Sequence, residues 1–136
     1  MSEVPHNVRV ATHEAGHAVC ARLLRLPGCG GVFLEPEPGA FFPRDHGAAS
    51  VCAMMAGAIA EVIHFGDYDP IGITTDWRRA RRRMKRLGYH DNGEALWNYT
   101  YGLLRGHRGT IALVALRLLA AGALTADEID GLMRSP

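Results

Sequence analysis

The sequence predicts a single domain over residues 1–136 that is mainly α with a small β element. Apolar residues recur at steps of three and four over several long stretches, which is the period of an amphipathic helix. The region rich in glycine and proline, residues 28–43, contains only short apolar runs, which are typical of strands and turns. A length of 136 residues with 48% hydrophobic content suits one compact core and is too short for two.

The first half of the chain is expected to contain two long helices separated by short strands. Helical spacing of apolar residues predicts a helix over residues 8–26, which a proline and a glycine end. The stretch from residue 47 to residue 65 is almost wholly apolar, with Glu61 as its only acid, and predicts a buried helix. Two apolar runs between these helices, residues 31–34 and 40–42, are the expected strands.

The second half of the chain is also expected to be helical. Thr74 or Thr75 can cap a helix that follows a turn-rich loop. Thr125 and Glu128 have the spacing of a capping box and so predict a short last helix. The expected helices run to about residue 87, from about residue 91 to residue 121 with a break within residues 102–109, and from residue 125 to residue 133.

The charge balance argues against a nucleic-acid or membrane-surface protein. Fifteen Lys and Arg residues against fourteen Asp and Glu residues give a formal net charge of +1. Seven basic residues gather in residues 78–86, but an apolar stripe through the same segment leaves them on the outer faces of one helix. A solvated helix face is therefore preferred over a nucleic-acid site. The stripe comprises Trp77, Ala80, Met84 and Leu87.

Cysteine usage and the N-terminal sequence predict a soluble, cytoplasmic protein. Cys20, Cys29 and Cys52 are an odd number of cysteines at spacings that match no common zinc-finger or disulfide pattern, so reduced thiols are expected. The N-terminal residues lack the basic and apolar regions of a secretion signal. No stretch has the roughly 18 uncharged apolar residues that a membrane span requires.

Residues 13–17 read His-Glu-Ala-Gly-His, the HExxH pattern, and fall inside the first expected helix. His13 and His17 lie one turn apart on the same face, so both imidazoles can bind one zinc ion. Glu14 is then placed as the general base that takes a proton from the attacking water. Two purely structural histidines are the alternative, but burying them and an acid in an apolar helix is costly without partners.

A catalytic zinc site requires a third protein ligand, which the spacing alone does not name. Glu61 and Asp76 are the leading candidates. Iron, cobalt or nickel would suit two imidazoles and a carboxylate as well. Weaker candidates for the third ligand are His46, His64, Asp67 and Cys20.

Three separated blocks of the sequence carry a more specific pattern. Residues 11–19 read Ala-Thr-His-Glu-Ala-Gly-His-Ala-Val, residues 57–66 read Gly-Ala-Ile-Ala-Glu-Val-Ile-His-Phe-Gly, and residues 74–80 read Thr-Thr-Asp-Trp-Arg-Arg-Ala. In this order and approximate spacing, the blocks resemble the peptidase domain of the FtsH family of zinc metallopeptidases. The resemblance spans roughly residues 8–88, and the three blocks are similar to the family's zinc helix, its Gly-x-x-Ala-Glu-x-x-x-Phe-Gly helix and its Asp-Leu-x-x-Ala segment.

The resemblance implies a zinc metallopeptidase with one Zn²⁺ per chain and a complete set of site residues. Its zinc ligands would be His13, His17 and Asp76, with Glu14 as the base and Glu61 as an acceptor that orients a ligand histidine. FtsH proteins join this domain to an ATPase module and usually to membrane helices, whereas this sequence contains no Gly-x-x-x-x-Gly-Lys-Ser/Thr loop. The region of residues 28–43 is also short for the family.

The expected function is therefore hydrolysis of peptides or unfolded proteins, either without ATP or together with a separate ATPase partner. Residues 31–34 are the expected edge strand that pairs with an extended substrate. A ring-shaped homo-oligomer is a further implication of the resemblance. The alternative is a zinc-binding regulatory or scaffold module of the same fold with little or no turnover. Neither nucleic acid nor a membrane is an expected partner.

Overall fold

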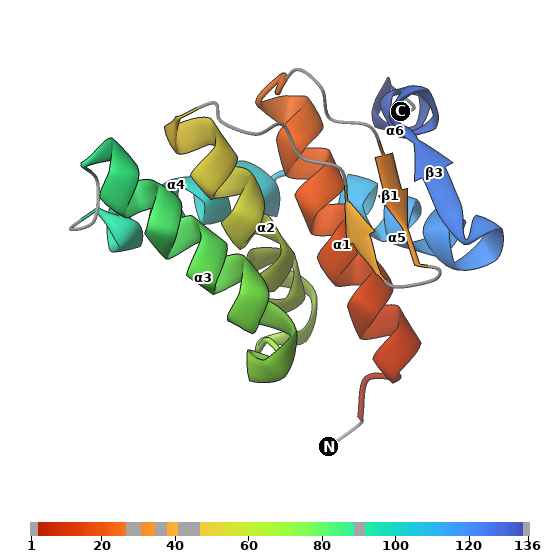
Figure 1. Ribbon diagram of the computed structural model, residues 1–136. Coiled ribbons are helices and arrows are strands. Elements are labelled where there is room, and N and C mark those ends of the chain that lie inside the picture. The colour runs from red at the N-terminus through yellow and green to blue at the C-terminus, as the bar shows by residue number, and fades with distance from the viewer. Residues whose placement is uncertain (1–2, 27–30, 35–37, 41–46, 89–91, 135–136) are drawn as a thin grey trace.

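The computed structural model describes residues 3–26, 31–34, 38–40, 47–88 and 92–134, and these residues form six helices and three short strands (Figure 1). The expected fold class, mainly α with a small β element, is confirmed. The elements are α1 (His6–Leu23), β1 (Gly31–Phe33), β2 (Gly39–Ala40), α2 (Ala48–Phe65), α3 (Pro70–Leu87), α4 (Gly93–Arg105), α5 (Arg108–Ala121), β3 (Ala123–Thr125) and α6 (Ala126–Arg134).

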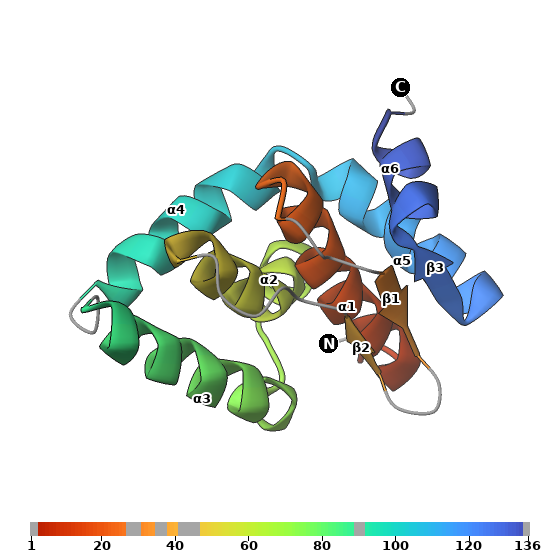
Figure 2. The ribbon, with the colours of Figure 1, turned by 45° about the horizontal axis from the view of Figure 1, so that its top comes forward.

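α1 lies at the centre of the fold. It packs against α2 on one side and against α5 on the other, while α2 also contacts α3 and α4 (Figure 2). Every residue from Ser50 to Glu61 is buried, as expected for this apolar stretch. By length and composition α2 is apolar enough to cross a membrane, and 67% of it is buried inside the fold. Its apolar character is accounted for by its place in the core.

Gly16 brings α1 and α2 into direct backbone contact. A Cβ at this position would lie 2.5 Å from Cβ of Ala60 and 2.6 Å from the carbonyl oxygen of Ala56. Such distances are shorter than real carbon contacts, so only glycine fits here. His13 and His17 lie on the same face of α1 as Gly16, so the close approach of the two helices places both histidines directly against α2.

The expectation for the start of α3 is wrong by about one turn. The helix begins at Pro70, and the side chain of Asp69 caps it by accepting a hydrogen bond from Ile71 N at 3.0 Å. An Asp followed by Pro is a strong helix start, because proline at the first position has no N–H to satisfy. Asp76 therefore lies in the second turn of α3, with its backbone already held in the helix.

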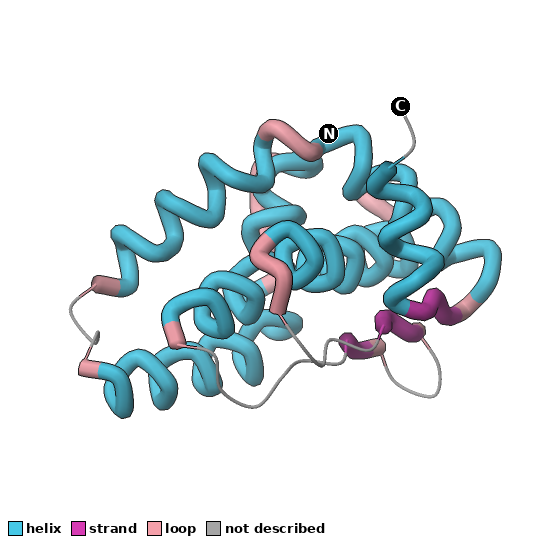
Figure 3. Tube along the Cα trace, turned by 90° about the horizontal axis from the view of Figure 1, so that it is seen from above, coloured by secondary structure: helices cyan, strands magenta, loops and turns pink. Residues whose placement is uncertain are grey.

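The three strands form an antiparallel sheet in the order β2-β1-β3, beside α1 and α6 (Figure 3). Val32 of β1 is paired with Ala40 on one side and with Leu124 on the other. The expected edge strand at residues 31–34 is thus the central strand. The expectation was wrong because β3, which follows α5 directly and is too short to show a strand pattern, covers its second edge. Among the described residues, β2 pairs with one strand, β1, and it also contacts α1.

The C-terminal half agrees with the expected helices. The break falls at Gly106 and His107, between α4 and α5. The capping box is confirmed, because Thr125 N donates to Glu128 Oε1 and Glu128 N donates to Thr125 Oγ1, both at 3.1 Å. Asp91, at the expected start of this helical segment, lies outside the described residues. The apolar stretch of α5 supplies core residues, namely Ile111, Val114, Ala115 and Leu118.

Candidate metal centre

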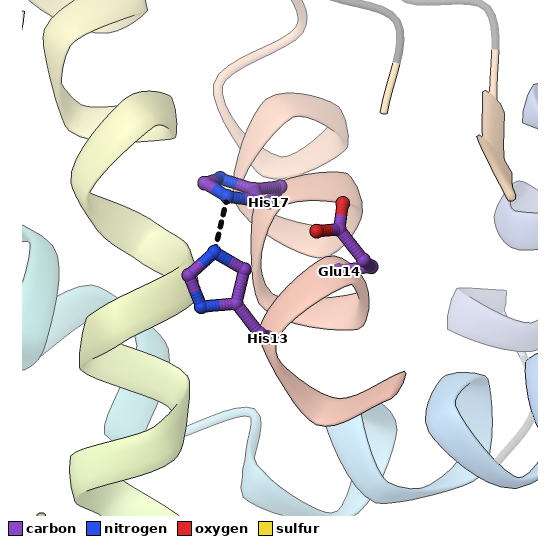
Figure 4. A group of neighbouring side chains, drawn as sticks. All are labelled: His13, Glu14 and His17. Atoms are coloured by element: carbon purple, nitrogen blue, oxygen red, sulfur yellow. Dashed lines mark hydrogen bonds between the residues drawn. The ribbon is translucent and has the colours of Figure 1, made fainter. Parts of the chain in front are cut away.

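The imidazoles of His13 and His17 project from α1 toward α2 (Figure 4). Both residues are buried, with 7% and 2% of their surface exposed. Their Nε2 atoms are 3.0 Å apart, and the rings meet edge to face with centroids 4.7 Å apart. The two nitrogens that could bind a metal therefore point at a common position.

Asp76 of α3 completes a triangle with these two nitrogens. Its Oδ2 lies 2.8 Å from Nε2 of His13 and 2.9 Å from Nε2 of His17. Ligands bound to one zinc ion at about 2.0–2.2 Å lie about 3.3 Å apart in a tetrahedron, so these atoms would need to separate by only a few tenths of an ångström. Among the candidates for a third ligand, Asp76 is the one that the fold places against both Nε2 atoms.

The hydrogen bonds of the Nδ1 atoms determine which nitrogen of each imidazole carries the proton. Nδ1 of His17 lies 2.7 Å from the carbonyl oxygen of Ala53, and Nδ1 of His13 lies 2.7 Å from Oε2 of Glu61. Both oxygens are acceptors, so each Nδ1 carries the proton and donates. In the neutral rings both Nε2 atoms then present lone pairs to each other and to the carboxylate of Asp76. Three acceptors that converge in a buried site require a cation or added protons between them.

The charges and hydrogen bonds of this cluster shift the pKa values of its members. Burial alone would lower the pKa of His13, but its hydrogen bonds with Asp76 and Glu61 outweigh burial and raise that pKa to about 10. Burial alone would raise the pKa of Asp76, but the charge of His17 and the hydrogen bonds with both histidines hold it well below its usual value. The carboxylates thus stabilise positive charge at this position, and a divalent cation fits the same donor set.

Glu14 lies beside the triangle without joining it. Its carboxylate oxygen and the two histidine nitrogens all lie within 4.8 Å of one another, whereas Asp76 approaches both nitrogens to 2.9 Å or less. Glu14 is 7% exposed, and burial raises its pKa, an effect that the nearby His17 and His13 partly oppose.

Glu61 supports His13 from below the triangle and is itself held by two donors. Its Oε1 accepts hydrogen bonds from Nη1 of Arg9 at 2.9 Å and from the backbone N of Asp69 at 3.1 Å. Arg9 also donates from Nη2 to Oδ1 of Asp67 at 2.8 Å. Both oxygens of this buried carboxylate therefore accept hydrogen bonds, and the carboxylate in turn fixes the orientation of His13.

Gly57 of α2 faces the two imidazoles across the helix contact. A Cβ at this position would lie 2.5 Å from Nε2 of His13 and 2.6 Å from Nε2 of His17. Any side chain here would occupy the position at which the two nitrogens converge. The backbone of α2 therefore forms one wall of the site, and glycine is required there for lack of space.

A cavity of about 220 Å³ opens next to His13 and Glu14. Its wall combines apolar residues, Val10 of α1 and Pro38 beside β2, with the polar residues His6, Arg9, Glu61 and Asp69. The buried carboxylate of Glu14 thus faces a space that a small group can enter. Pro38, in its wall, directly precedes β2.

The other residues considered from the sequence lie elsewhere. Asp67 pairs with Arg9 at the surface, 72% exposed. Cys20 is in the core, where burial raises its pKa well above the usual value for a thiol. His64, on α2, is not among the residues of the triangle, and His46 lies outside the described residues.

Sequence reasoning missed Arg9, Asp69 and the carbonyl of Ala53 as supports, and it assigned no role to Gly57. Gly57 was visible as the first residue of the Gly-x-x-Ala-Glu block. No local signal marks Arg9, which lies 52 positions from Glu61.

Comparison with models of known protein families and with curated proteins found no match to this chain.

Proposed function

We propose that this chain is a zinc-dependent peptidase domain in which His13, His17 and Asp76 hold the metal and Glu14 is the general base. The observation that carries the proposal is the convergence of three acceptor atoms within 3.0 Å of one another in a buried site. Glu14 is buried beside them, and a carboxylate oxygen of Glu14 lies within 4.8 Å of a ring nitrogen of each histidine. The resemblance to the FtsH peptidase domain supports the same assignment of these four residues.

When bound, zinc supplies a Lewis acid that acidifies a water molecule and polarises a carbonyl group. Glu14 accepts the proton of the attacking water and returns it to the leaving amine, a task that its raised pKa suits. The acceptors at Nδ1, Glu61 for His13 and the carbonyl of Ala53 for His17, keep both rings in the tautomer that leaves Nε2 free to bind.

The proposed substrate is a peptide or an unfolded protein segment. The cavity beside Glu14 has about 220 Å³, which is room for one side chain and not for a folded protein. Pro38 borders this cavity and directly precedes β2, so an extended peptide paired with β2 would run past Glu14. Supply of unfolded segments by a separate ATPase, and assembly of several copies, remain part of this proposal.

The test combines metal analysis with hydrolysis of casein by four proteins. Wild type is expected to bind about one zinc per chain and to cleave casein. Glu14→Gln is expected to keep the metal and lose about 10²-fold or more in rate, because it cannot accept the proton. Asp76→Ala is expected to lose both metal and activity. Glu94→Gln, on the exposed start of α4, is the control and should behave as wild type.

Three outcomes of this test would overturn parts of the proposal. Zinc binding without cleavage by wild type would favour the alternative, a regulatory or scaffold module of the same fold. An active Glu14→Gln protein would contradict the proposed mechanism. Retention of zinc by Asp76→Ala would move the third ligand to another residue.

A further inference from the structure

A groove of about 650 Å³ lies between α3 and α4, the helices that diverge in Figure 2. Ile73, Thr74, Trp77, Arg78 and Arg81 of α3 line one side, Trp97 of α4 lines the other, and Tyr68 and Pro70 close one end. None of the residues of the metal centre lines it. The groove is therefore a second, separate feature of the molecule, larger than the cavity beside Glu14.

Three aromatic side chains form the floor of the groove. The ring of Trp97 lies between those of Tyr68 and Trp77, with centroid distances of 6.2 Å and 6.3 Å and edge-to-face geometry. Tyr68 is 40% exposed. Both tryptophans are only partly buried against the core. Aromatic surface left open in a concave site is typical of a binding surface.

The polar groups of the groove favour a negatively charged ligand. Arg78 and Arg81 can only donate hydrogen bonds, as can the indole N–H groups, and none of the described residues that line the groove has a carboxylate or amide side chain. The guanidinium of Arg81 lies 6.0 Å from the ring centre of Trp77. Among the ion pairs of the described residues, none involves Arg78 or Arg81. Both cations are thus available to carboxylates.

The extent of the positive surface favours a polypeptide over a small molecule. Arg78, Arg81 and Lys85 follow one another at steps of three and four, so they line one face of α3. At about 1.5 Å per residue, this row spans roughly 10 Å along the helix and continues beyond the aromatic floor. A net charge of +1 for the whole chain lacks the broad positive field that nucleic acids require.

We propose that this groove binds an acidic polypeptide segment that carries an aromatic or aliphatic side chain. The apolar side chain packs on the exposed aromatic surface of Trp77 and Trp97, and neighbouring carboxylates pair with Arg78 and Arg81. Such a segment, in a substrate or a partner protein, would be held on α3, the helix that also carries Asp76. The proposal does not use the candidate metal centre, because none of the residues of that centre lines the groove.

The chain itself provides the readout, because Trp77 and Trp97 are its two tryptophans and both line the groove. The probe is the tryptophan-free peptide acetyl-Asp-Glu-Leu-Phe-Glu-Asp-amide, titrated into Glu14→Gln protein with and without EDTA while tryptophan emission is recorded. We expect a saturable change with a dissociation constant in the micromolar range, equal in both conditions. The peptide with Asn and Gln in place of its acids is expected to bind about tenfold or more weakly.

Two double variants with the same change of charge on the same helix test the location. Arg78→Glu with Arg81→Glu removes the cations of the groove and is expected to weaken binding about tenfold or more. Arg79→Glu with Arg82→Glu, on a different face of α3, is the matched control and is expected to change binding less than about threefold. Circular dichroism and thermal unfolding verify that both variants fold.

Three outcomes would overturn the proposal. The first is an absence of saturable change with the acidic peptide. The second is an equal loss of binding in the two double variants, which would indicate unspecific attraction to the basic helix. The third is tighter binding of a single-stranded oligonucleotide or of phenylpropionate than of the peptide, which would assign the groove to nucleic acid or to a small carboxylate. Failure of the peptidase test leaves this result unaffected, because peptide binding is measured without hydrolysis, both with and without EDTA.

Discussion

At the scale of single residues, the candidate centre depends on the absence of a side chain at Gly57 as much as on the two histidines. Gly57 leaves open the position to which Nε2 of His13 and Nε2 of His17 point, because a Cβ there would lie 2.5–2.6 Å from both atoms. Hydrogen bonds from the opposite nitrogens then determine that both Nε2 atoms present lone pairs. The absence of a side chain at Gly57 and two hydrogen bonds thus leave the Nε2 atoms of two core histidines side by side at one position.

Replacing Gly57 with Ala is expected to abolish zinc binding and to lower the free energy of unfolding. The methyl group would displace both imidazoles from the triangle, and overpacking of this kind costs about 1–3 kcal/mol. Urea denaturation and a competition titration with a chromophoric zinc chelator measure the two effects. The matched control is Gly102→Ala on α4, where nothing lies within 4 Å of the added Cβ.

The control is expected to be neutral or slightly stabilising, by up to about 1 kcal/mol, because alanine is the better helix former. Zinc affinity of Gly102→Ala should equal that of wild type. A Gly57→Ala protein with wild-type zinc affinity would show that the metal lies away from this position.

At the scale of elements, Arg9 ties together the segments that carry the site. Its guanidinium contacts Glu61 of α2 and both the side chain and the backbone oxygen of Asp67, which precedes α3. The backbone N of Asp69, the cap of α3, binds the same Glu61 carboxylate. Arg9 therefore relates α1 to α2 and to the start of α3, and it acts on the centre through the position of Glu61.

Replacing Arg9 with Lys is expected to weaken zinc binding by about tenfold, within the range found for residues that support metal ligands. Lysine keeps the charge but loses the planar fork that reaches Glu61 and Asp67 together. Zinc affinity is measured by the same competition titration. Arg22→Lys is the matched control, because Arg22 forms a bidentate pair with Asp130 of α6, with distances of 2.7 Å and 2.6 Å.

Both lysine variants lose a forked ion pair that starts on α1, so a general loss of helix stability would affect them equally. Only Arg9→Lys should lower zinc affinity. Equal zinc affinities for the two variants would contradict the positioning role of Arg9.

At the scale of the whole molecule, α3 is the long helix with the fewest attachments. It packs on α2, whereas α1 and α2 each contact several elements. Among the described residues, Asp76 also joins α3 to α1 through its contacts with His13 and His17. A metal ion bound by these residues would connect α3 to the centre of the fold, so metal binding is expected to be coupled to the stability of this helix.

Removal of metal with EDTA is therefore expected to lower the midpoint of thermal unfolding by roughly 10 °C. This value follows from about 2.7 kcal/mol at a metal concentration 100 times the dissociation constant and about 4 °C per kcal/mol for a chain of this size. Calorimetry measures the shift, and hydrogen exchange should show the largest loss of protection in α3. Asp76→Ala is the control, and EDTA should leave its midpoint unchanged. A uniform loss of protection over all helices would contradict the special dependence of α3.

The helical fold class, and the placement of His13, Glu14 and His17 on one helix, were predictable from the amino-acid sequence alone. These features depend on local spacing, since residues four apart lie on one helix face wherever the helix packs. The buried character of α2 and the capping box of α6 were predictable for the same reason. Asp76 and Glu61 were reached only as candidates, with a family resemblance to choose between their roles.

The positions of Asp76, Arg9 and β1 were not predictable in this way, because they depend on contacts between distant parts of the chain. The place of Asp76 against both Nε2 atoms requires the packing of α3 on α2, and the role of Arg9 requires contacts with residues 52 and 58 positions away. The central position of β1 follows from its pairing with β3, about 90 residues later in the chain. No local pattern encodes such pairings, since they arise from the burial of shared surfaces when the helices pack together.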